Sequence, residues 1–264
     1  MSSTPHTLEE VLHPRSVAII GVSRSPHKWG HVAARQLIEG GFSGAIYFIN
    51  PSISEVLGHP TYASLRDVPG PVDLAVITTS FHHVSAAIDD CIAHGVKGIV
   101  LITAGFSETG PEGRVLEEQL VARCREHGIR VIGSNCMGIY VRHSHLNALG
   151  MVFPLPAGPI GLVSQSGNLG MYFYAQANLD GLGFTTFLSI GNAADVTFPE
   201  CMQYLANDPE TRVIAGYVEA IQEETLRQVT QDMRERGCYK PVVILLSGAT
   251  EVGVRASLAH TGTV

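Results

Sequence analysis

The amino-acid sequence predicts an α/β protein whose parallel sheets carry helices on both faces. Short β-branched runs alternate with helical stretches from one end of the 264-residue chain to the other. The strand runs are apolar throughout, as buried parallel strands require. Hydrophobic residues make up 45% of the sequence and charged residues 16%, a composition that is typical of a globular protein and argues against disorder.

The first half of the chain contains five predicted strands and three predicted helices. The strands are expected at Val17–Val22, Ile46–Asn50, Leu74–Thr78, Gly98–Ile102 and Arg130–Ile132. The helices are expected between them, near Gly30–Gly40, His82–His94 and Pro111–His127. This βαβ rhythm predicts a first domain over residues 1–150.

A proline-rich stretch, Phe153–Pro159, indicates a linker or domain boundary, after which the rhythm restarts. Strands are expected at Ile160–Val163, Phe184–Ser189, Val213–Val218 and Val242–Leu246, with helices near Gly167–Leu179, Phe198–Leu205 and Glu223–Arg236. We predict a second domain over residues 151–264. Its last segment, Leu258–Val264, is a glycine-containing loop with no closing element, which we interpret as a truncated C-terminus.

Composition and charge narrow the range of functions. The formal net charge of −7 disfavours a nucleic-acid surface. Met1–His6 has no basic segment before an apolar run, so no secretory signal is expected, and no apolar run approaches the length of a membrane span. The five cysteines lack C-x-x-C spacing, which favours a reducing cytoplasm over a disulfide framework or zinc site. The close pairs His82–His83 and His143–His145 lack carboxylates at ligand spacing, so no metal site is predicted.

A loop between the first strand and the first long helix, Gly21–Gly30, has the features of a phosphate site. Backbone N–H groups at a helix N-terminus bind phosphate, and Arg24 and Lys28 add positive charge. The loop lacks the G-x-G-x-x-G pattern, and the second strand ends in Asn50-Pro51 without the acid that binds a ribose, which disfavours an NAD-dependent oxidoreductase. A cofactor with several phosphates, such as CoA, fits better; a turn that binds nothing is the alternative.

Three more loops leave the carboxyl ends of predicted strands, where open α/β sheets bind ligands. They are Thr78–Phe81, Thr103–Phe106 and Gly133–Gly138. Within the last loop, Cys136 either lies near a thiol-bearing cofactor or is simply buried.

In the second half, a serine-rich loop again precedes a helix. Ser164 and Ser166 can donate hydrogen bonds to a phosphoryl group, with the backbone N–H of Gly167 and the helix dipole behind them. The alternative is a serine that only caps the helix. Near the C-terminus, His260 stands among small residues, and a neutral imidazole is a competent nucleophile toward phosphorus. Glu219, at the end of an apolar strand, is the best candidate to hold the tautomer of that imidazole.

Six segments, taken in order, resemble one protein family. They are His13–Gly21, Gly133–Gly138, Gly161–Gly167, Ser189–Val196, Tyr217–Ala220 and Ala259–Gly262. Together they are similar to the α subunit of succinyl-CoA synthetase, and more closely to the α portion of ADP-forming acetyl-CoA synthetases, the NDP-forming acyl-CoA synthetase family. The resemblance implies a Rossmann-like CoA-binding domain followed by a flavodoxin-like domain of the succinyl-CoA-synthetase type.

The resemblance also implies roles for individual residues. CoA would be held by residues of the first domain: Gly21, Ser23, Arg24, Ser25, Lys28, Pro51, Thr78, Thr103, Asn135 and Cys136. The last two would lie near the thiol end. His260 would be the phosphorylated histidine, oriented by Glu219, and Ser164, Ser166 and Gly167 would face it.

The family reaction forms an acyl-CoA from a carboxylic acid, CoA and ATP through an acyl phosphate and a phosphohistidine, reversibly. ATP or ADP and Mg²⁺ would bind an ATP-grasp partner, either a separate subunit in a hetero-oligomer or a fused domain. Two departures from the family pattern bear on nucleotide or substrate details. Ala259 stands before the histidine, and Leu246 and Ala249 are apolar in the segment Leu245–Ala249, where the family often has a basic residue. The alternative function is a CoA-binding regulatory module, or a relative fused to a protein acetyltransferase, without ligase activity.

Overall fold

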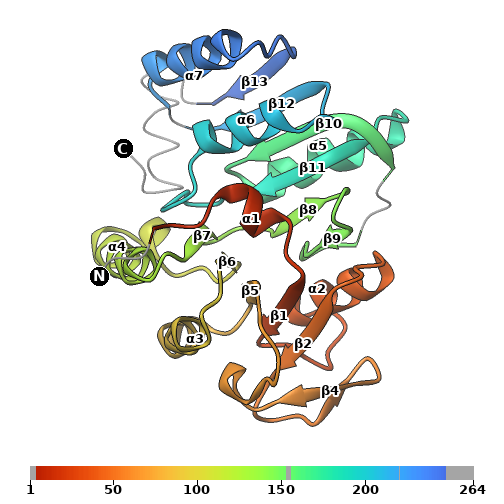
Figure 1. Cartoon of the computed structure of the whole chain (residues 1–264), viewed down its shortest axis with the longest axis vertical. Helices are drawn as coiled ribbons and strands as arrows, with labels where there is room; N and C mark the ends of the chain where they lie inside the picture. Colours follow the sequence, from red (N-terminus) through yellow and green to blue (C-terminus); the bar gives the residue numbers. More distant parts are fainter. Residues whose placement is uncertain (1–3, 153–155, 220, 248–264) are drawn as a thin grey trace.

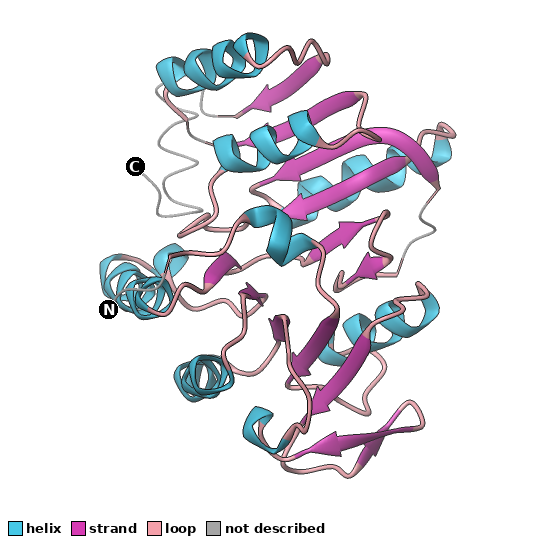
Figure 2. Cartoon of the chain, in the orientation of Figure 1, coloured by secondary structure: helices cyan, strands magenta, loops and turns pink. Residues whose placement is uncertain are grey.

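The computed structural model of the chain consists of two α/β units, which lie one above the other in Figure 1. The structure describes residues 4–152, 156–219 and 221–247. Each unit is a twisted sheet with helices packed against its faces (Figure 2).

The first sheet has seven strands in the order β3-β4-β2-β1-β5-β6-β7. Their bounds are β1 Ser16–Ile20, β2 Ala45–Ile49, β3 Glu55–Val56, β4 His59–Tyr62, β5 Leu74–Ile77, β6 Gly98–Leu101 and β7 Arg130–Gly133. The helices are α1 Leu8–Leu12, α2 Trp29–Glu39, α3 Phe81–His94 and α4 Pro111–Glu126, with 3₁₀ turns at Leu65–Asp67 and Ser107–Thr109. Strand β1 lies in the middle, where Val17 pairs with Ile46 on one side and with Leu74 on the other.

The second sheet has six strands in the order β13-β12-β10-β11-β8-β9. They are β8 Ile139–Val141, β9 Leu146–Asn147, β10 Ala157–Ser164, β11 Phe184–Ser189, β12 Val213–Val218 and β13 Val242–Leu246. Its helices are α5 Gly167–Leu179, α6 Phe198–Asn207 and α7 Glu223–Glu235. In Figure 1, α6 and α7 lie in front of this sheet and α5 lies behind it.

Every strand and long helix that the sequence predicts overlaps an observed one, with ends that agree within three residues. The predicted parallel sheets are confirmed for most strand pairs. At the edges the sheets are mixed, because β3 pairs with β4, and β8 with both β9 and β11, in the antiparallel sense. These short strands have no long apolar run that would reveal them. Strands β8 and β9 lie before residue 150, within the first predicted domain, but they belong to the second sheet. The chain therefore enters the second sheet before it reaches the predicted domain limit.

The strands β1, β5, β6 and β7 of the first sheet are buried on both faces, as continuous apolar strands require. Alternate residues of β1 enter different cores: Val17 and Ile19 pack in the cluster that contains Leu37 of α2, whereas Ala18 and Ile20 pack in the cluster that contains Ile88 of α3. The first of these clusters continues into α6 and α7 of the second half. The two halves therefore share one hydrophobic core.

The segment after β11 runs beside β7 and joins the halves through the backbone. The N–H groups of Asn192, Ala194 and Val196 donate to the carbonyl oxygens of Ser134, Gly133 and Val131 over 3.0, 3.1 and 3.1 Å. The segment thereby covers the open edge of the first sheet.

Asp195 anchors this segment. Its carboxylate, 1% exposed, accepts from Arg125 Nε at 2.6 Å, Arg130 Nε at 3.0 Å and the backbone N–H of Val131 at 2.7 Å. Arg130 also makes two 2.8 Å bonds to Glu200. Burial costs a charge its hydration, so each of these groups depends on its partners.

We expect Asp195→Ala to lower the free energy of unfolding by about 3 kcal/mol, because Arg130 and the N–H of Val131 lose their buried acceptor. Urea unfolding followed by circular dichroism measures the change. The control is Asp89→Ala, which removes the partner of Arg123 from an exposed pair and should cost less than about 1 kcal/mol. Equal losses in the two variants would show that Asp195 does not anchor the segment.

Candidate functional site

A cavity of about 410 Å³ lies where the carboxyl ends of strands from both sheets meet. Open α/β sheets bind ligands at this position. Both halves contribute to its wall: Trp29, Thr78, Thr79, Ile102, Thr103, Ala104, Asn135, Cys136 and Met137 come from the first half, and Gln165, Ser166, Gly167, Asn168, Gly191 and Asn192 from the second.

None of the described residues that line this cavity is charged. Hydroxyl and carboxamide groups make its polar surface, together with the start of α5. Ser166 caps that helix, since its Oγ accepts from the N–H of Leu169 at 3.3 Å. Gly167 and Asn168 follow directly, and the backbone N–H groups of a first helical turn have no partner within the helix. The cavity therefore suits an uncharged polar ligand, with an anionic group beside the start of α5.

Glu219 lies beside the start of α5, at the end of β12. It is 4% exposed, and its backbone N–H donates to Gln165 Oε1 at 2.6 Å. Ser164 is fully buried and donates its hydroxyl proton to the carbonyl of Ser166 at 2.6 Å. The Ser164 hydroxyl therefore stabilises the loop conformation. The Ser166 hydroxyl accepts a hydrogen bond from Leu169, and its own proton can be donated to a ligand. His260 lies outside the described residues.

The first loop forms a separate surface next to this cavity. The Ser23 hydroxyl accepts from the N–H of Ser25 at 3.1 Å, and Arg24 Nε donates to the carbonyl of Glu55 at 3.0 Å. Ser25, Lys28 and Pro51 are exposed. The two ends of the loop are packed tightly together. A Cβ at Gly30 would stand only 2.4 Å from the carbonyl oxygen of Gly21.

The structure thus divides the predicted residues into two neighbouring groups. Thr78, Thr103, Asn135, Cys136, Ser166 and Gly167 line the cavity. Gly21, Ser23, Arg24, Ser25, Lys28 and Pro51 lie on or near the first loop and do not line the cavity. Thr78 connects the groups, since its hydroxyl lies 3.1 Å from the carbonyl oxygen of Ile20 and 3.2 Å from that of Gly21.

Four cavity residues lie in segments that were named from the sequence but were not assigned a role of their own: Trp29, Thr79, Gln165 and Asn192. Asn192 lies in a segment that carries the family resemblance, but its contacts are set by residues far away in the sequence. Its Nδ2 donates to Glu108 Oε2 at 2.7 Å and to Glu117 Oε1 at 3.0 Å. The pKa of the Glu108 carboxyl lies below its usual value. Burial by itself would raise this pKa, but hydrogen bonds from the N–H of Gly105 and from Asn192 lower it by more.

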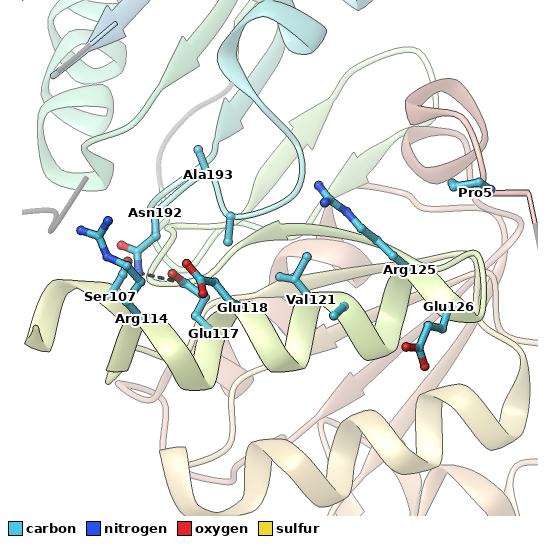
Figure 3. A pocket seen from close by; sticks show the side chains of 12 residues that line it. Pro5, Ser107, Arg114, Glu117, Glu118, Val121, Arg125, Glu126, Asn192 and Ala193 are labelled. Carbon is cyan, nitrogen blue, oxygen red and sulfur yellow. Dashed lines mark hydrogen bonds between the residues drawn. The ribbon is translucent and has the colours of Figure 1, made fainter. Parts of the chain in front are cut away.

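A larger groove, of about 660 Å³, lies along α4 on the other side of Asn192 (Figure 3). Charged side chains of both signs line it, among them Arg114, Glu118, Arg125 and Glu126. No predicted site residue lines the groove. We therefore place the candidate site in the smaller cavity, where strand ends and a helix N-terminus converge.

In the described part of the chain, no helix is both long and apolar enough to cross a membrane. The same residues contain no group of three or more histidine, cysteine or acidic side chains that could hold a metal ion. All five cysteines are free thiols.

Cys136 is a neutral thiol in the cavity wall. Burial raises its pKa to about 12, and its Sγ lies 3.4 Å from the carbonyl oxygen of Leu101. The thiolate is the reactive form of cysteine. Cys136 therefore lines the site without acting as a nucleophile at neutral pH.

At pH 8 we expect iodoacetamide to alkylate Cys136 more than about a thousandfold more slowly than a free cysteine, because so little thiolate is present. Peptide mass spectrometry over a time course gives the rate. Cys238, which is only partly buried, is the internal control. Modification of both cysteines at one rate would contradict this assignment.

Two family profiles match the chain. The profile described as "CoA binding domain" matches residues 15–142, and the one described as "Succinyl-CoA ligase like flavodoxin domain" matches residues 157–264. The predicted order, a CoA-binding domain followed by a flavodoxin-like domain, is confirmed.

Similar proteins are ligases of one kind. The alpha subunit of ADP-forming acetate–CoA ligase II from Pyrococcus furiosus is 38% identical over 97% of this chain and 55% of that subunit. The ADP-forming acetate–CoA ligase of Methanocaldococcus jannaschii is 37% identical over 98% of this chain and 36% of that protein. The chain thus spans about half, or less, of the length of these relatives.

A solved structure agrees with the sequence relatives. Acetyl-coenzyme A synthetase 1 of Ca. Korarchaeum cryptofilum, in complex with phosphate and ADP, superposes with a TM-score of 0.90 at 36% identity. The match covers 100% of this chain and 56% of that one. The chain therefore belongs to the family of NDP-forming acyl-CoA synthetases.

Proposed function

We propose that this chain binds CoA and, with an ATP-grasp partner, forms an acyl-CoA from a carboxylic acid, CoA and ATP, reversibly. The observation that carries the proposal is the cavity between the two sheets. It joins the strand ends of a CoA-binding sheet to the N-terminus of α5, so that an uncharged thiol-bearing chain and an anionic phosphoryl group can meet in it. Relatives named as ADP-forming acetate–CoA ligases support the reaction class.

CoA has two chemically different ends, and the site has two matching surfaces. Its phosphates would bind the first loop, where Arg24 and Lys28 supply positive charge beside the start of α2. Its amide-rich arm would lie in the uncharged cavity, with the thiol near Asn135 and Cys136. Hydroxyl and carboxamide groups in the cavity wall match amide groups of the ligand.

The proposed reaction has three steps, written here from acyl-CoA. Phosphate displaces CoA from the acyl group and gives an acyl phosphate. His260 then takes the phosphoryl group, and the carboxylic acid leaves. Phosphohistidine finally transfers the phosphoryl group to ADP on the partner. Covalent transfer through a histidine divides one difficult step into easier ones.

Glu219 and the start of α5 suit the histidine step. Glu219 is buried at the end of β12, and its backbone N–H donates to Gln165, two residues before α5 begins. A carboxylate in such a place can accept from one ring nitrogen and leave the other free to attack phosphorus. The N–H groups of the first turn, with Ser166 and Gly167, would bind the phosphoryl oxygens.

The partner would supply what this chain lacks. The nucleotide and Mg²⁺ would bind an ATP-grasp subunit or fused domain, and a hetero-oligomer in the cytoplasm is the proposed state. A CoA-binding regulatory module without ligase activity is the alternative, and the histidine experiment distinguishes the two.

We expect His260→Ala to abolish phosphorylation of the chain by acetyl phosphate while the affinity for CoA stays the same, because the acceptor nitrogen is lost and the CoA surfaces are untouched. Radiolabelled phosphate on the protein, stable to base and labile to acid, measures the first effect, and calorimetry the second. His127→Ala, which changes an exposed histidine at the end of α4, should be phosphorylated normally. Labelling of the His260 variant at the normal rate would rule out the phosphohistidine role.

We expect the double substitution Arg24→Gln and Lys28→Gln to weaken CoA binding about tenfold and to reduce its salt dependence, because two charged phosphate contacts are removed. Calorimetric titrations at low and high salt measure both effects. Arg212→Gln, at an exposed position of the second half, is the control. CoA affinity unchanged by the double substitution would place the phosphates elsewhere.

A further inference from the structure

The side-chain amide of Asn192 is locked in one orientation. Its Nδ2 lies 2.7 Å from a Glu108 oxygen, 3.0 Å from a Glu117 oxygen and 3.1 Å from Ser134 Oγ, and Figure 3 shows the bond to Glu117. An ionised carboxylate only accepts hydrogen bonds. If the amide rotated by half a turn, its oxygen would face these carboxylate oxygens, so the observed orientation is the stable one.

The environment of the two carboxylates reinforces this lock. Glu117 is 5% exposed, and the Ser134 hydroxyl donates to the same Oε1 atom that accepts from Asn192. Glu108 accepts from the backbone N–H of Gly105 at 2.5 Å and of Phe106 at 3.2 Å. Both carboxylates are thus fixed by groups other than Asn192.

The lock leaves the Asn192 oxygen as a hydrogen-bond acceptor at the cavity. Its described contact is Asn135 Nδ2 at 3.5 Å, the outer limit of a hydrogen bond, so the oxygen retains capacity to accept. The N–H groups that begin α5 are donors in the wall of the same cavity. The cavity wall therefore offers an acceptor at Asn192 and donors at the start of α5.

We propose that Asn192 is a positioning residue that accepts a hydrogen bond from the thiol of CoA. The inference rests on the proposed function, which places the thiol near Asn135, the neighbour of Asn192. A thiol is a donor, so it fits the acceptor wall, whereas phosphoryl oxygens fit the donors of α5. The acceptor and the donors thereby direct the sulfur and the phosphoryl group to different positions in one cavity.

The test compares CoA with desulfo-CoA, which lacks the sulfur, by calorimetric titration of the full chain. We expect the wild type to bind CoA about threefold more tightly, since a thiol is a weak donor. Asn192→Ala should bind the two ligands equally. Glu108→Gln should lose part of the preference, because it removes one of the two carboxylates that fix the orientation of Asn192, while Glu117 remains. Glu118→Gln, an exposed glutamate on the same helix as Glu117, should keep the wild-type ratio.

A threefold ratio in the wild type that disappears in Asn192→Ala and falls in Glu108→Gln supports the proposal. A ratio that persists in Asn192→Ala, with both ligands weakened alike, overturns it and leaves Asn192 a structural role. Equal affinities in the wild type also overturn it. If Asn192→Ala does not fold, judged by its thermal melt, the Glu108 variant decides. If the wild type bound neither ligand, the proposed CoA site itself would be wrong. This outcome differs from a failure of the Asn192 proposal, in which the wild type still binds CoA.

Discussion

The backbone pairing between β7 and the segment after β11 is the contact on which the site depends. Three N–H groups of residues 192–196 bond to the carbonyls of Ser134, Gly133 and Val131, and Asp195 fixes the same segment through two arginines. The pairing holds the strand ends of one sheet opposite the helix N-terminus of the other. Gly191 makes the approach possible, because a Cβ there would stand 1.9 Å from the carbonyl oxygen of Ser134.

The same pairing explains why the cavity is polar but uncharged. The charged groups near it have partners outside the cavity wall or at its edge. Glu108 accepts from Asn192 and from backbone N–H groups, Glu117 accepts from Asn192 and Ser134, and Asp195 pairs with Arg125 and Arg130. Buried charges are stable only with such partners. The wall itself is left with hydroxyls, carboxamides and helix N–H groups, which can bind a long amide-bearing ligand without a fixed countercharge.

Much of the fold could be predicted from sequence, because buried parallel strands and the loops after them leave a strong local signal. The strand end at Thr78 and the helix start at Ser166 are examples, and both line the cavity. Asn192 could not be assigned a role in this way. Its partners Glu108 and Glu117 lie 84 and 75 residues away, so its orientation depends on tertiary packing. The hairpins β3–β4 and β8–β9 were missed because strands of two to four residues carry little periodicity.

Trp29, the single tryptophan of the sequence, lines the cavity and is 40% exposed. Indole emission depends on the polarity around the ring, so the tryptophan fluorescence of this chain originates in the wall of this cavity. Occupancy of the cavity can therefore be followed optically in the unlabelled protein, without a dye or an engineered residue. The chain carries its own spectroscopic reporter beside its candidate site.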